Sequence, residues 1–267
     1  MKDRPYWNKR METLTPEEYR SIHTEKLLKQ LAYVSKNSLF YQKKFRESDV
    51  DVKEIKSLKD LGKLPLTEKA ELRDSQLASP PLGLHMACAM KKVKRIYSTS
   101  GTTGRPTFIG LTKRDLSVWR EATSRAFWTG GFRGDSIVPL VVAPYLIAAS
   151  YMDAIENVGT CVPIGVGATD RLIAAFQFIG ANALLSTSSF PLHFADSLRK
   201  RGIDPRSGRV HVATRHRPAD RSLPARGPAL LLARARLPGP GLLGLDGGAL
   251  PRRGAPDPGL QRRRLCR

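Results

Sequence analysis

The rest of the chain is arranged around the sequence Tyr97-Ser98-Thr99-Ser100-Gly101-Thr102-Thr103-Gly104-Arg105-Pro106. Five of its ten residues carry a small hydroxyl group, and its two glycines permit positive φ, so a ligand can lie directly on main-chain N–H groups. Arg105 adds a forked cationic donor suited to phosphate oxygens, and Pro106 stiffens the exit. The same composition marks ordinary solvated turns, and the glycine spacing is not that of the NTPase P-loop. The stretch is therefore either a solvated turn or an anion-binding loop.

The flanking patterns place this loop between a strand and a helix. Alternating side chains over residues 93–97 predict a strand that leads into the loop. The basic run 91–95 either attracts an anionic nucleotide or CoA, or is simply a solvated strand. Downstream, Thr112 is expected to cap a helix that runs through Trp128.

Strands and helices then alternate with short connections up to residue 201. This order is typical of βαβ units around a mostly parallel sheet. The expected strands are 137–142, 160–164 and 183–187, and the expected helices are 143–157, 170–179 and 191–201.

The region before residue 93 is predicted to be helical. Thr15 and Glu18 form a capping box, and apolar residues recur at helical spacing up to Val34. Short capped helices are expected at 57–61 and 67–72. The organisation is thus a helical N-terminal region at 1–92 and a partial α/β domain at 93–207.

The remaining residues, 208–267, have a different composition. They hold eight prolines and no Phe, Tyr, Trp, Ile or Lys, and 13 arginines stand against three acidic residues, out of a net charge of +21 for the whole chain. Prolines prevent a long helix or a central strand, and little is left to pack. We expect a disordered tail, which is either a genuine polyanion-binding segment or a stretch read out of frame.

Cysteine spacing and hydropathy indicate in which cellular compartment the protein is expected to act. Cys88, Cys161 and Cys266 are widely separated and indicate neither a disulfide framework nor a zinc site, so no metal ligand is assigned. The start lacks the apolar core of a signal peptide, and the apolar run 137–151 falls short of the roughly 20 residues that span a bilayer. We expect a cytoplasmic protein that binds neither membrane nor nucleic acid.

Three further segments accompany the loop and resemble one known family. They are Lys29–Val34, Asn37–Tyr41 and Leu64–Arg73. With Ser-Gly-Thr-Thr-Gly-Arg-Pro, they resemble the phenylacetate-CoA ligase family of the AMP-forming acyl-CoA synthetase (adenylate-forming) superfamily. The resemblance runs from about Leu14 to Pro205 and covers only the N-terminal part of the family. It implies a helical segment followed by part of the adenylate-forming large domain.

The resemblance also implies a reaction. The family joins an aryl or acyl acid to CoA, with ATP and Mg²⁺, and releases AMP and pyrophosphate. The residues that match its ATP-phosphate loop are Thr99, Ser100, Gly101, Thr102, Thr103, Gly104 and Arg105. Tyr145 is the candidate wall of the acid pocket, with plain core packing as the alternative. His85 is expected to be incidental and His193 to be partly buried structure, and no catalytic side chain is assigned.

Several of the family's later features are absent from the sequence. There is no in-frame aromatic-Gly-x-Thr-Glu motif, whose glutamate serves Mg²⁺ in the family, and no late lysine-bearing domain. We therefore expect the chain as translated to be an inactive, truncated ligase fragment. The alternatives are an adenylating enzyme with another acceptor, of the capsule-biosynthesis or deazaflavin-adenylation type, and a non-catalytic polyanion-binding protein.

The out-of-frame hypothesis makes a prediction at the DNA level. Residues 242–248, Leu-Leu-Gly-Leu-Asp-Gly-Gly, can be encoded so that dropping one base yields Tyr-Trp-Gly-Ser-Thr-Glu-Gly, which resembles the missing motif. We expect the gene from codon 200 onward to hold an open shifted frame that encodes it. Sequencing that DNA is the measurement, and early stop codons in the shifted frame would contradict the hypothesis.

Overall fold

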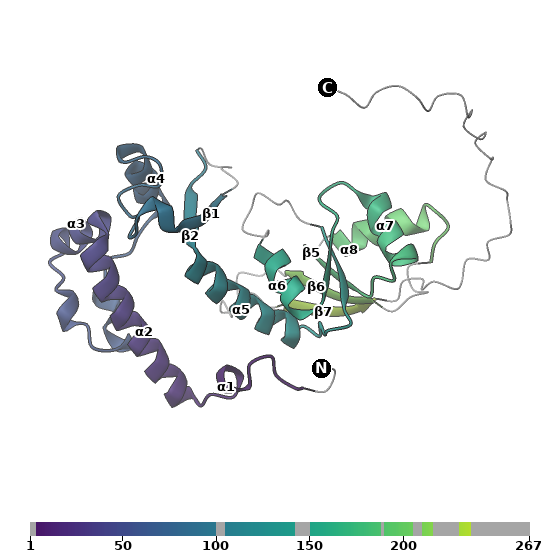
Figure 1. Ribbon diagram of the computed structural model, residues 1–267, viewed down its shortest axis with the longest axis horizontal. Coiled ribbons are helices and arrows are strands. Elements are labelled where there is room, and N and C mark those ends of the chain that lie inside the picture. The colour runs from purple at the N-terminus through teal and green to yellow at the C-terminus, as the bar shows by residue number, and fades with distance from the viewer. Residues whose placement is uncertain are drawn as a thin grey trace, which may run out of the picture.

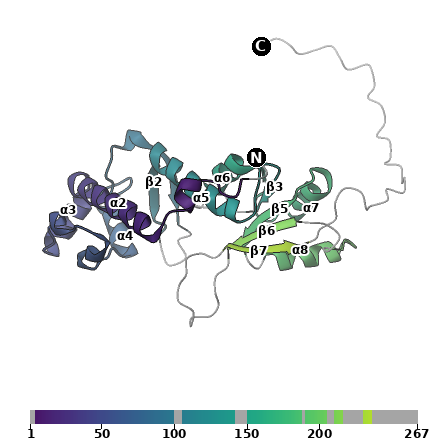
Figure 2. The ribbon, with the colours of Figure 1, turned by 90° about the horizontal axis from the view of Figure 1, so that it is seen from below.

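The computed structural model describes residues 4–99, 105–141, 150–187, 190–204, 210–215 and 230–235. A group of N-terminal helices lies at one end and a five-stranded sheet at the other, with a β-hairpin and one long helix between them (Figures 1 and 2). Among the described residues no helix is long and apolar enough to cross a membrane.

The N-terminal region is helical, as predicted. Its helices are α1 (Lys9–Glu12), α2 (Pro16–Asn37), α3 (Leu39–Glu47) and α4 (Lys69–Ala78), with 3₁₀ turns at Val52–Glu54, Leu58–Lys63 and Met90–Lys92. The capping box that begins α2 is present: Thr15 Oγ1 accepts from the Glu18 N–H at 3.2 Å, and a Glu18 carboxylate oxygen accepts from the Thr15 N–H at 2.8 Å. Leu31, Phe45 and Ile55 form the buried core of this region.

A β-hairpin follows. Strand β1 (Val93–Ser98) pairs antiparallel with β2 (Phe108–Thr112), and the two form a sheet of their own. The sequence pattern predicted β1 but not β2. The outer edge of β2 is covered at Phe108, whose N–H donates to the Gln76 side-chain oxygen and whose carbonyl accepts from the Gln76 amide, at 3.2 and 2.6 Å.

Helix α5 (Lys113–Thr129) leads from the hairpin to the main sheet. It begins at the predicted cap, where Thr112 Oγ1 accepts from the Asp115 N–H at 3.3 Å. The main sheet contains β3 (Ile137–Leu140), β4 (Thr160–Pro163), β5 (Ala183–Thr187), β6 (Val210–Arg215) and β7 (Leu230–Ala235) in the order β4-β3-β5-β6-β7. The first four are mutually parallel, which confirms the predicted mostly parallel sheet, and β7 is antiparallel to β6.

Helices cover both faces of the sheet. Phe127 and Trp128 of α5 and Ile155 of α6 (Ser150–Val158) pack on the face that holds Val138 and Leu185. Helices α7 (Thr169–Phe178) and α8 (Phe190–Arg199) pack on the opposite face. The alternation of buried side chains along β3 and β5 explains why each strand contributes to both cores.

The two C-terminal strands differ from the expectation of a disordered tail over 208–267. Residues 210–215 and 230–235 are short runs free of proline, and valine, leucine and alanine supply most of their side chains. Such a run can extend a parallel sheet whose edge β5 would otherwise leave open, because its main-chain groups find partners there. The rest of the tail lies outside the described residues.

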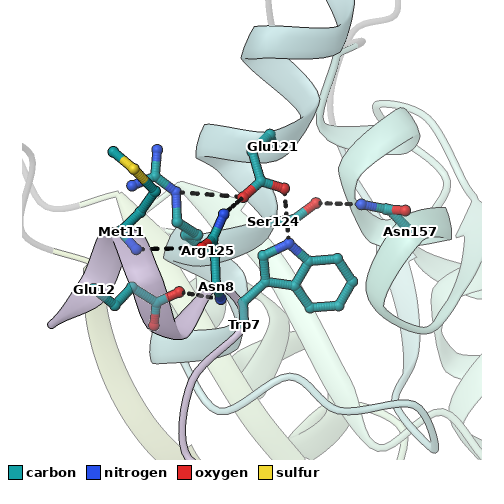
Figure 3. Close-up of polar contacts among 8 residues, drawn as sticks. All are labelled: Trp7, Asn8, Met11, Glu12, Glu121, Ser124, Arg125 and Asn157. Atoms are coloured by element: carbon teal, nitrogen blue, oxygen red, sulfur yellow. Dashed lines mark hydrogen bonds and ion pairs between the residues drawn. The ribbon is translucent and has the colours of Figure 1, made fainter. Parts of the chain in front are cut away.

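Trp7 and Asn8, near the start of the described chain, bind the side of α5 (Figure 3), and we call this pair the N-terminal clasp. The Trp7 indole N–H and the Asn8 side-chain amide donate to the two oxygens of Glu121 on α5, at 3.0 and 2.8 Å. Burial raises the pKa of Glu121, but these hydrogen bonds and the charges of Arg125 and Arg4 together outweigh it, and the pKa lies below its usual value. One turn along α5, Ser124 accepts from the Asn157 amide of α6 at 3.1 Å. The clasp and α6 thus hold α5 from two sides.

Gly159 links α6 to β4 and allows a test of this packing. A Cβ at this position would lie 2.6 Å from the Ser136 carbonyl oxygen and 2.9 Å from that of Arg133. Both are backbone atoms that cannot swing away, so we expect Gly159→Ala to lower the free energy of unfolding by about 1–3 kcal/mol. Chemical denaturation measures this. Gly134→Ala is the matched control because nothing lies within 4 Å of its Cβ position; equal losses in both variants would contradict the packing.

Candidate functional site

The order of the parallel strands marks one edge of the sheet as the place for a ligand. Strand β3 is followed by α6 on one face and then by β4, whereas β5 is followed by α8 on the other face and then by β6. The connections after the neighbouring strands β3 and β5 therefore diverge at their carboxyl ends. Ligands of open α/β sheets bind at such a switch point. The candidate site lies outside the ends of β3 and β5.

The turn after β4 belongs to the same edge. Gly165 and Gly167 have positive φ of 80° and 78°, a backbone conformation that favours glycine and explains both residues. Val166 between them is 71% exposed. The turn reverses the chain into α7 without a side-chain cap on that helix.

The hydroxyl-rich loop is carried by the hairpin. Thr99 directly follows β1, and Arg105 is exposed just before β2 and makes no ion pair with any described residue. Residues Ser100 to Gly104, and Tyr145 as well, lie outside the described residues. The structure thus places the two ends of the loop at the turn end of the hairpin, where β1 leads into β2.

A pair of threonines closes the base of the loop. The Thr99 N–H donates to the Thr107 carbonyl at 3.0 Å, and the Thr107 N–H donates to Thr99 Oγ1, also at 3.0 Å. A side-chain oxygen therefore takes the place of a main-chain carbonyl in the last rung of the ladder. Thr107 is 3% exposed, and its own hydroxyl has no hydrogen-bond partner among the residues that the structure describes. No sequence motif distinguished Thr107, because its role depends on β2.

The other reactive side chains considered have structural surroundings. His85 Nδ1 lies 3.1 Å from Ser75 Oγ, whose oxygen also accepts from the His85 main-chain N–H, and burial lowers the pKa of His85. Burial raises the pKa of the Cys161 thiol to about 11, so the thiol stays protonated. Within the described ranges, no group of three or more His, Cys, Asp or Glu side chains could hold a metal ion.

Comparison with known proteins gives the class of protein. A solved structure of 2-hydroxyisobutyryl-CoA ligase in complex with 2-HIB-AMP and CoA matches with a TM-score of 0.72 at 28% identity, over 76% of this chain and 44% of that one. An open conformation of the same ligase matches with a TM-score of 0.71 at 26% identity, over 76% of this chain and 48% of that one. The hairpin and parallel sheet are thus those of an adenylate-forming CoA ligase.

Sequence relatives narrow the class. The chain is 33% identical to the phenylacetate-coenzyme A ligase of Thermus thermophilus over 198 residues, which are 73% of this chain and 43% of that protein. It is 31% identical to the enzyme of Aromatoleum evansii over 207 residues, 76% of this chain and 46% of that protein. No family model matches the chain. Over the part that these relatives match, the chain is similar to phenylacetate-CoA ligases, and it spans about half their length.

The threonine pair at the loop base yields a prediction. Thr99→Val keeps the shape of the side chain but leaves the buried Thr107 N–H without an acceptor, so we expect a loss of about 1–3 kcal/mol in unfolding free energy. Thr99→Ser retains the acceptor and should lose far less. Chemical denaturation of both variants is the measurement, and a Thr99→Val protein as stable as the original would show that the hydrogen bond contributes nothing.

Proposed function

We propose that the chain carries the phosphate-binding part of an AMP-forming acid–CoA ligase whose substrate is a small aryl or acyl carboxylate such as phenylacetate. The observation that carries the proposal is that this chain matches a ligase whose structure was solved with an acyl-adenylate and CoA. The β1–β2 hairpin of this chain also bears a Ser/Thr/Gly loop. A cytoplasmic location is part of the proposal.

The proposed reaction has two steps. A carboxylate oxygen attacks the α-phosphorus of ATP, the bond to the β-phosphate oxygen breaks, and pyrophosphate leaves. The CoA thiolate then attacks the carbonyl carbon of the acyl-adenylate, and AMP leaves as the thioester forms. A carboxylate is a poor electrophile because its leaving group would be oxide, and adenylation replaces that group with AMP. Catalysis then consists mainly of positioning and charge stabilisation.

The hydroxyl-rich loop is proposed to hold the β- and γ-phosphates. Main-chain N–H groups and hydroxyls of Thr99, Ser100, Gly101, Thr102, Thr103 and Gly104 supply neutral donors, and Arg105 supplies charge. The exposed, unpaired state of Arg105 among the described residues supports this role, since its guanidinium is available to an anion. Tyr145, which comes after β3 in the sequence, is the proposed wall of the acid pocket.

Mg²⁺ enters the proposal only with the nucleotide. The described residues offer no cluster of carboxylates or imidazoles for the ion, and the sequence lacks the aromatic-Gly-x-Thr-Glu segment in frame. No step is assigned to a protein-bound metal. Because the sequence holds no in-frame copy of this glutamate-bearing segment, we propose that the chain as translated releases no pyrophosphate.

Two other functions remain open to test. An enzyme of the same fold with an acceptor other than CoA would still make the adenylate. A screen of acids and acceptors on the ligase expressed from the repaired reading frame distinguishes this function from a CoA ligase. A polyanion-binding role is favoured by the 13 arginines in residues 208–267. It requires salt-sensitive DNA binding that disappears when these residues are deleted.

The loop assignment is tested with Arg105→Ala. Hydrogen bonds to charged groups contribute about 1.5–3 kcal/mol, so we expect the dissociation constant for MgATP or inorganic pyrophosphate, measured by calorimetry at low salt, to rise about tenfold or more. Arg114→Ala, another exposed arginine on the first turn of α5, is the matched control and should bind as the original does. Equal affinity of all three proteins would remove Arg105 from the site.

A further inference from the structure

The β1–β2 hairpin depends on other elements for its position. It forms a two-stranded sheet of its own, separate from the five-stranded sheet. Two strands alone are marginally stable in water. Its covalent link to the main sheet is α5, a single helix, so the angle between the two bodies has to be fixed by side-chain contacts.

An arginine on β1 makes such a contact with the helix that follows β3. Arg95 Nη1 donates to Asp153 Oδ2 at 2.5 Å and Arg95 Nη2 donates to Asp153 Oδ1 at 3.3 Å, so the pair is bidentate. Nη1 also donates to the Tyr97 hydroxyl oxygen at 3.0 Å. The planar fork of arginine suits this two-point contact, which holds orientation as well as distance.

The surroundings of the pair favour a strong contact. The Arg95 and Asp153 side chains are 36% and 23% exposed, so solvent screens them only in part. Tyr97 is 3% exposed, and its ring meets Trp119 of α5 at 6.4 Å between centroids. The hydrogen bonds that Arg95 donates to Asp153 and Tyr97 raise the pKa of Arg95. The contact thus joins three elements, β1, α5 and α6.

The pair also lies between the two parts of the proposed site. Arg95, Tyr97 and Thr99 are alternate residues of one extended segment, and Thr99 is the first residue of the loop. A shift of β1 therefore moves Thr99 directly. Asp153 lies in the first turn of α6, the helix that leads away from the carboxyl end of β3. One bidentate contact therefore spans the phosphate-binding hairpin and the switch point.

We propose that Arg95 and Asp153 are a positioning pair that fixes the location and angle of the β1–β2 hairpin relative to the carboxyl edge of the main sheet. Its value for the reaction rests on the proposed function, because the pair would hold bound triphosphate against the acid. Neither residue touches the reacting atoms. Small misplacements of reacting groups lower rates by up to about a hundredfold, which is why a contact of this kind matters.

The geometric claim is tested without any ligand. Spin labels on Lys94→Cys, on β1, and Thr160→Cys, on β4, in a chain whose other cysteines are serine, report the hairpin-to-sheet distance distribution by pulsed electron resonance. We expect one narrow distribution in the parent chain and a broadened or displaced one in Arg95→Ala and in the isosteric Asp153→Asn. Circular dichroism establishes that each variant is folded.

A charge reversal separates positioning from mere stability. The double variant Arg95→Asp with Asp153→Arg restores an ion pair and is expected to narrow the distribution again, which a general loss of packing would not do. Arg199→Ala breaks an exposed pair with Asp196 on α8 and is the matched control. A parent-like distribution in both single variants, or a broad one in the parent chain itself, overturns the proposal.

A second measurement ties the pair to the site. We expect Arg95→Ala to raise the dissociation constant for MgATP about tenfold, and the charge-reversed variant to recover most of it. Unchanged affinity together with a broadened distance distribution shows that the pair sets the hairpin without serving the nucleotide, which overturns its role in the reaction. If the parent chain binds no MgATP, the proposed function fails, and the distance measurement alone decides on the pair.

Discussion

Burial of the C-terminal half of α5 is the constraint on which the rest of the structure depends. Phe127 and Trp128 are almost completely removed from water against the sheet, and each such aromatic contributes about 1.5–3 kcal/mol when fully buried. The same helix begins at the hairpin, so its burial decides where the hairpin stands. The N-terminal clasp uses the same stripe of the helix two turns before Trp128, where Glu121 accepts from Trp7 and Asn8. Hairpin, sheet and N-terminal region therefore share a single support.

Trp128 shows how closely these parts are joined. Its indole N–H donates to the Arg4 carbonyl at 3.2 Å, and the guanidinium groups of Arg4 and Arg133 lie over its ring, at 5.0 and 4.3 Å from the ring centroid. Cations over an indole face are attracted by its negative quadrupole. Residues 124 positions apart in the chain thus meet at one ring, which lies between the sheet core and the chain's first turns.

The sequence pattern predicted most of the fold where local signals and tertiary packing agree. The caps at Thr15 and Thr112 and the strand 183–187 are present as predicted, because capping and apolar runs are local features. Strand β2 was not predicted, since its outer edge is stabilised by a hydrogen bond from Gln76, which is 32 residues away in the sequence. The same limit applies to the candidate site. Thr99 and Arg105 could be named from a motif, whereas Thr107 and the Arg95–Asp153 pair depend on which elements the fold brings together.

The Gln76 amide has a further consequence for how the protein behaves in a crowded solution. A hairpin with a free outer strand offers its main chain to any extended peptide, and intermolecular pairing of this kind leads to swapped dimers and fibrils. Gln76 occupies both main-chain groups of Phe108, and Asp115 accepts from the N–H of Thr112 at the far end of the same strand. A foreign strand would have to displace both side chains. The helix and the cap that shape the hairpin thus also protect it from self-association.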